Sequence, residues 1–181
     1  EVRVHLYLDG TAELETENGP VCVTVHTDYP ASGEIRMEVT GDCDLALRLP
    51  GWCHGSYDLT VNGQEVLTAP QNGYLHLKEL RGETQLTLTL PMVPRRVYAH
   101  SAVRADLGRV AIMRGPVVYC VESADNGPNL HLLAVPRNAA LIPAWDENLF
   151  GGAWRIKAMG LKRNMDDDKA PLYTCLLYTS P

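Results

Sequence analysis

The stretch EIRMEVTGDCDLALRL, residues 34–49, decides the fold. Apolar residues occupy alternate positions on both sides of its single glycine: Ile35, Met37, Val39, Leu45, Leu47 and Leu49. Successive side chains of a β-strand point to opposite faces of its sheet, so this period of two buries one face and leaves the polar neighbours on the other. The stretch therefore predicts two half-buried antiparallel strands.

The same alternation recurs to either side of this stretch. It is found in residues 1–8, 21–26, 75–77 and 85–90. Turn dipeptides separate the segments: Asn18-Gly19, Asn62-Gly63 and Asn72-Gly73. Strand-like segments that recur at intervals of about 8–15 residues, with turn signals between them, are typical of a β-sandwich. We expect no helix, and in residues 1–8 we expect Val2, Val4, Leu6 and Leu8 to face the core.

The pattern changes near Pro91 and Pro94, because proline cannot donate to a strand ladder. We predict an all-β protein with two consecutive antiparallel β-sandwich domains, residues 1–95 and 96–174, the second incomplete. The chain opens at Glu1 within a strand pattern and closes on CLLYTSP, residues 175–181, which resembles a translated adapter. We expect a fragment with a non-native tail. The compartment stays open, although unpaired cysteines and the lack of a glycosylation sequon favour the cytoplasm.

Composition excludes two classes of partner. The chain has 16 Lys+Arg and 22 Asp+Glu, a net charge of −6. Phosphate binding relies on concentrated positive charge, so a nucleic-acid partner is not expected. No apolar run approaches the length of about 18 residues that a membrane helix requires, so a membrane partner is not expected either.

Metal and catalytic signals are weak. The five cysteines show no metal-binding spacing, and adjacent Cys53 and His54 would point to opposite faces of a strand. The acidic runs 42–44 and 166–168 lack an EF-hand pattern and are interpreted as solvated turns. Glu122 and Asp125 follow a predicted strand and could act as acid and base, but a solvated turn is the preferred interpretation. We therefore predict no catalytic and no metal-binding residue in this chain.

Aromatic residues leave carbohydrate binding open. Sugar rings stack on exposed aromatic side chains, and the chain has three tryptophans, Trp52, Trp145 and Trp154. Large aromatic residues also anchor cores. Trp52, between Pro50-Gly51 and Cys53, is expected in the core. Trp145 and Trp154 are our candidate sugar-binding residues.

Several motifs resemble a known family. These are PGWC (50–53), VNG (61–63), LPMVPRRVYAH (90–100) and, most specifically, GRVAIMRGPVVYCVE (108–122). In this order and spacing they resemble the region that follows the catalytic barrel in glycoside hydrolase family 127, whose characterised members are β-L-arabinofuranosidases. The resemblance implies a retaining hydrolase with a helical barrel and a zinc-held cysteine nucleophile, followed by two β-sandwiches.

The residues that the family uses for catalysis have no match in this chain. The resemblance thus implies an accessory region that is inactive by itself and supports its own upstream barrel. Zinc is expected in that barrel and not in this chain, and a homodimer of the parent protein is a further expectation. The alternative is a carbohydrate-binding module that functions without a catalytic partner. A third hypothesis makes the fragment itself catalytic through Glu122 or Asp125.

Overall fold

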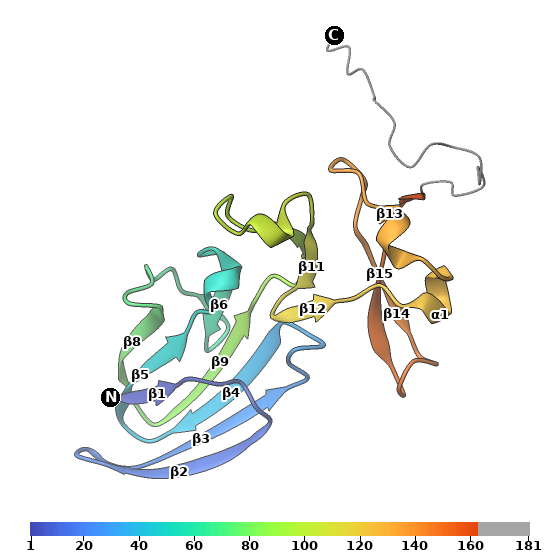
Figure 1. The fold of residues 1–181 in the computed structure, drawn as a ribbon. Coiled ribbons are helices and arrows are strands. Elements are labelled where there is room, and N and C mark those ends of the chain that lie inside the picture. Colours follow the sequence, from blue (N-terminus) through green and yellow to red (C-terminus); the bar gives the residue numbers. More distant parts are fainter. Residues whose placement is uncertain (163–181) are drawn as a thin grey trace, which may run out of the picture. The chain divides into compact units, whose positions relative to one another are not determined.

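The computed structural model describes residues 1–162, so the predicted tail at 175–181 and the acidic run at 166–168 lie outside the described residues. The first and larger part is built from two facing sheets (Figure 1). The six-stranded antiparallel sheet has the order β2 (Gly10–Thr16), β3 (Gly19–Thr27), β4 (Glu34–Thr40), β9 (Glu83–Thr89), β6 (Asp58–Val61), β7 (Gln64–Glu65). The three-stranded sheet has the order β1 (Val2–Val4), β5 (Cys43–Arg48), β8 (Tyr74–Leu80).

The core lies between these two sheets. Side chains from both sheets form one buried cluster, to which Ile35, Met37, Leu45, Leu47 and Leu88 contribute with at most 1% exposure. These are the positions at which the sequence alternates with a period of two. The predicted all-β, antiparallel sandwich architecture is confirmed, although β1 pairs with β5 in the parallel direction.

Two details of the alternation differ from expectation. Strand β1 ends at Val4, and beyond it Tyr7 is buried while Leu6 and Leu8 are about two-thirds exposed. The Tyr7 hydroxyl donates a hydrogen bond to the Arg48 carbonyl, which turns the tyrosine inward and reverses the predicted faces. Ala46, expected on the outer face of its sheet, is fully buried because its register partners Arg3 and His76 flank it on both sides.

Three smaller sheets follow. Strands β10 (Pro94–Val97), β11 (Ala111–Arg114) and β12 (Val117–Tyr119) form an antiparallel sheet; β14 (Ile142–Asp146) pairs with β15 (Ala153–Lys157), and β13 (Leu133–Ala134) with β16 (Leu161–Lys162). Helical segments are single turns: η1 (Gly51–Cys53), η2 (Arg104–Asp106), α1 (Ser123–Asn126) and η3 (Leu130–Leu132). Within residues 1–162 no helix has the length and apolarity to cross a membrane.

The chain packs as two compact units. The first contains residues Glu1–Cys120 together with Pro143–Ile156, so most of the β14–β15 hairpin belongs with the large sandwich. The second contains Val121–Ile142 and the chain from Lys157. The boundary predicted after residue 95 falls within β10, and the division into domains at that residue stays a prediction.

Candidate functional site at the β14–β15 hairpin

Trp154 ties the β14–β15 hairpin to the large sandwich. Its indole Nε1 donates a hydrogen bond of 2.8 Å to the carbonyl oxygen of Ala31, in the connection between β3 and β4. The Arg114 guanidinium carbon lies 4.2 Å from the centre of the indole ring, and Arg114 Nη1 donates to the same carbonyl at 3.2 Å. Half-buried Trp154 therefore connects three segments: its own strand β15, the β3–β4 connection through its N–H, and β11 through the contact of its ring with Arg114.

Arg114 is an unusual member of this cluster because its side chain is charged and only 6% exposed. Among residues 1–162 no carboxylate lies within ion-pair distance of it, and its buried Nε has no hydrogen-bond partner there. Burial of an unpaired charge is costly. The Trp154 ring and the Ala31 carbonyl offset this cost, since an arginine over an indole face is attracted to the ring quadrupole.

Trp145 is the tryptophan that the hairpin presents to solvent. It lies on β14, is 47% exposed, and meets Trp154 edge to face at a centroid distance of 5.5 Å and an interplanar angle of 70°. A side chain at Gly152 would collide with the Trp145 ring, so the indole packs directly over a glycine. The ring is therefore held in place from one side and accessible from another.

Polar groups and a third aromatic ring, in addition to the two tryptophans, lie on the same hairpin. Asp146 forms an ion pair with Arg155 at 2.9 Å and accepts a hydrogen bond of 3.0 Å from the backbone N–H of Asn148. Phe150, in the turn, is 93% exposed with a positive φ of 52°. Asp146 and Arg155 directly follow Trp145 and Trp154 in their strands, so their side chains point to the opposite face of the hairpin from the two indoles. A sugar on this hairpin would therefore stack on the exposed ring of Trp145.

The other candidates from the sequence lie elsewhere. Glu122 and Asp125 are exposed and belong to the N-terminal end of the one-turn helix α1. Trp52 is partly buried and packs against the core of the large sandwich, as expected. Cys53 is buried, and desolvation raises the pKa of its thiol to about 11, while neighbouring His54 is exposed.

The acidic turn at residues 42–44 is already occupied by protein cations. Asp42 pairs with Arg81 at 3.0 Å, and Asp44 pairs with Lys78 at 2.8 Å. Each carboxylate also accepts a backbone N–H, and these bonds keep the pKa of both groups below its usual value. No group of three or more His, Cys, Asp or Glu side chains within the described part of the chain could hold a metal ion. The residues present do not fit the zinc centre that the family resemblance implies.

Arg114 and Ala31 are the members of the tryptophan cluster that sequence reasoning missed. The contact joins residues 83 positions apart, which no local pattern can reveal. The one available signal was an arginine placed inside an apolar strand, directly before the Gly115-Pro116 turn.

The described fold defines the class of the molecule as an all-β, predominantly antiparallel sandwich protein. Two family models match it in succession, the GH127 middle domain of β-L-arabinofuranosidase over residues 1–92 and the glycoside hydrolase family 127 C-terminal domain over residues 94–160. The chain therefore belongs to glycoside hydrolase family 127.

Individual relatives agree with this assignment. A non-reducing end β-L-arabinofuranosidase of Bifidobacterium longum subsp. longum is 33% identical in an alignment 180 residues long that covers 93% of this chain and 27% of that protein. A crystal structure of a GH127 β-L-arabinofuranosidase from Geobacillus stearothermophilus T6 superposes with a TM-score of 0.89 and 34% identity, over 96% of this chain and 28% of that one. A solved structure of a GH127 β-arabinofuranosidase superposes with a TM-score of 0.82 and 31% identity, over 88% of this chain and 28% of that one. The chain thus spans little more than a quarter of these relatives.

Proposed function

We propose that this chain is the accessory β-sandwich region of a glycoside hydrolase that acts on terminal β-L-arabinofuranosides. The observation that carries the proposal is the consecutive match of residues 1–92 and 94–160 to the middle and C-terminal domains of that family. Within the proposal, residues 1–95 and 96–174 form the two domains, and a catalytic barrel of the same polypeptide precedes them. Any zinc that the whole protein uses is then bound by that barrel, where a metal-bound cysteine would be deprotonated and nucleophilic. A homodimer of the whole protein is compatible with this assignment.

The described residues support a structural role in this proposal. The first unit has a continuous core between two sheets, and the β14–β15 hairpin is fastened to it through Trp154 and Arg114. A sandwich of this kind offers a second domain a rigid body to pack on, because its side chains are close-packed and its strands are hydrogen-bonded.

The test is hydrolysis of 4-nitrophenyl β-L-arabinofuranoside by the intact parent protein and by residues 1–162 alone, each assayed with and without added zinc. The proposal predicts release of 4-nitrophenol by the intact protein and none by residues 1–162. Hydrolysis by residues 1–162, or an intact protein that is folded but inactive on this substrate, would refute it.

A second candidate function rests on the half-exposed ring of Trp145. We propose that a sugar stacks on Trp145, and that Trp154 contributes by holding Trp145 edge to face. Titration with L-arabinose and with arabinofuranoside oligosaccharides should then quench tryptophan fluorescence, and Trp145→Ala should abolish the response. Trp52→Phe serves as the control because Trp52 packs against the core. Unchanged fluorescence in the parent chain at millimolar sugar would exclude this function.

A further inference from the structure

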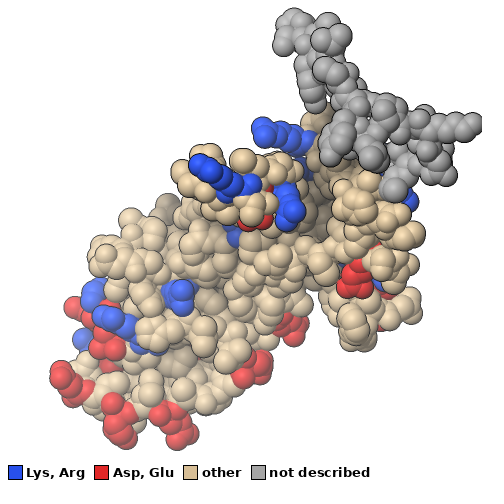
Figure 2. Space-filling model, viewed as in Figure 1, with Lys and Arg blue, Asp and Glu red and all other residues tan. Residues whose placement is uncertain are grey.

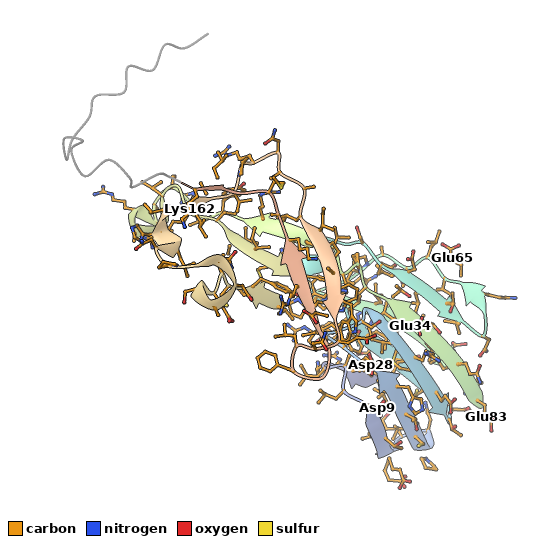
Figure 3. The ribbon with its side chains drawn as sticks, turned by 90° about the vertical axis from the view of Figure 1, so that its right-hand side faces the viewer. Asp9, Asp28, Glu34, Glu65, Glu83 and Lys162 are labelled. Carbon is orange, nitrogen blue, oxygen red and sulfur yellow. The ribbon has the colours of Figure 1, made fainter. Side chains whose placement is uncertain are left out.

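The segment from Pro94 to Tyr119 differs in charge from the sandwich that precedes it. Residues 1–93 carry 5 Lys+Arg against 14 Asp+Glu, a net charge of −9, whereas residues 94–119 carry five arginines against one aspartate, a net charge of +4. The acidic residues Asp9, Asp28, Glu34, Glu65 and Glu83 are distributed over the strands and connections of the sandwich (Figure 3). Basic side chains gather instead over the connection between β10 and β11 (Figure 2).

The same segment also exposes apolar side chains. Every residue from Tyr98 to Arg109 is exposed. Its large exposed apolar residues are Tyr98, Val103, Leu107 and Val118, between 45% and 64% exposed. Residues 1–92, more than three times as long, expose the same number. Arginine combined with aromatic and aliphatic side chains is the composition that protein interfaces favour. Exposed apolar groups collected in one short segment indicate a surface that another body covers.

The β10–β11 connection is ordered by its own backbone. It contains the single turn η2 (Arg104–Asp106), and the N–H groups of Leu107 and Arg109 donate to carbonyls three residues earlier. Arg109 pairs weakly with Asp106 at 3.9 Å, and both side chains are largely exposed. Within residues 1–162 Arg104 forms no ion pair. Residues 98–110 themselves carry Arg104 and Arg109 against Asp106, a net charge of +1. The connection thus presents a preformed, weakly basic and partly apolar surface.

We propose that the connection formed by residues 98–110 is the docking surface for the upstream catalytic domain. That domain contacts the connection through an acidic surface with an apolar centre. This inference rests on the proposed function, which supplies that domain. The matched part is only 27% of the length of the Bifidobacterium relative, so such a protein has ample chain to cover the surface. A symmetric contact between two copies of this connection would bring together two surfaces that each have a net charge of +1, whereas an acidic surface of the upstream domain would complement that charge.

The experiment is hydrogen–deuterium exchange on the intact parent protein, with residues 67–73 as the internal reference because they form a mostly exposed connection between β7 and β8. We expect amides of residues 98–110 to exchange at least tenfold more slowly than those of the reference. Leu107→Asp should remove this protection, whereas Leu67→Asp, which alters another exposed leucine and lies in the reference segment, should leave it intact. Arg104→Glu should weaken the protection, with Arg48→Glu as the matched charge reversal on the acidic sandwich.

Three results would overturn the proposal. Residues 98–110 could exchange as fast as the reference, Leu107→Asp could behave like Leu67→Asp, or the protection could vanish on dilution as a dimer dissociates, which would assign the surface to a second copy. None of these readouts depends on activity. An intact protein that is protected at residues 98–110 but does not hydrolyse arabinofuranosides would refute the proposed function and leave the docking surface in place.

Discussion

The contact between Arg114 and Trp154 gives the sharpest prediction about how the fold is held together. Trp154→Phe removes the indole N–H that donates to Ala31 and replaces the ring that binds arginine best. A neutral hydrogen bond contributes about 1 kcal/mol and a partly desolvated cation–π contact about 0.5–2 kcal/mol, so the free energy of unfolding should fall by about 1–3 kcal/mol. The Ala31 carbonyl still accepts from Arg114, so no orphan acceptor adds to this cost.

A double-mutant cycle separates the contact from its surroundings. Arg114→Met removes the charge but keeps the length of the side chain, and the cycle with Trp154→Phe isolates the interaction energy between the two residues. Urea unfolding of the chain, followed by far-UV circular dichroism because both variants alter tryptophan fluorescence, should give a coupling of about 0.5–2 kcal/mol. Strictly additive effects would refute the contact. A single variant Arg114→Met that is more stable than the parent chain would mean only that burial of the charge costs more than its contacts return.

Two further predictions concern local packing and the buried thiol. Gly33→Ala should destabilise the fold by about 1–3 kcal/mol because its new Cβ would collide with the Leu90 carbonyl, whereas Gly51→Ala, which meets open space, should be nearly neutral in the same urea titration. Iodoacetamide at pH 8 should alkylate exposed Cys120 well before Cys53, because the folded pKa of about 11 keeps the Cys53 thiol protonated; equal alkylation rates would contradict the burial of Cys53. Because burial raises this pKa, the stability that Cys53 contributes should decline only as pH rises towards 11.

Sequence patterns predicted the strands that have one clearly buried face. The residues of β4 and β5 alternate because each strand covers the core with every second side chain. Strand β2 was missed because it is an edge strand whose side chains are almost all exposed, so burial imposes no alternation on it. The reversal after Val4 depends on a hydrogen bond from Tyr7 to a residue 41 positions away, which the local pattern cannot contain.

The candidate site was predictable only in part. The tryptophan content of the hairpin was visible in the sequence, but the difference between Trp145, held at a solvent-exposed position, and Trp154, anchored on Ala31, results from tertiary contacts. The role of Arg114 was not visible for the same reason. The family, by contrast, was predictable from the motif at residues 108–122, and the matches to both domain models confirm that resemblance.

The most direct test of the account is to compare the intact parent protein with the upstream catalytic domain that we propose, expressed without residues 1–162, by measuring how fast each loses the proposed arabinofuranosidase activity at 45 °C. If the sandwich region supports the catalytic domain, the shortened protein should be insoluble or lose activity at least tenfold faster, because the surface covered by residues 98–110 becomes exposed. An upstream domain that is as soluble, as active and as long-lived as the intact protein would contradict the supporting role.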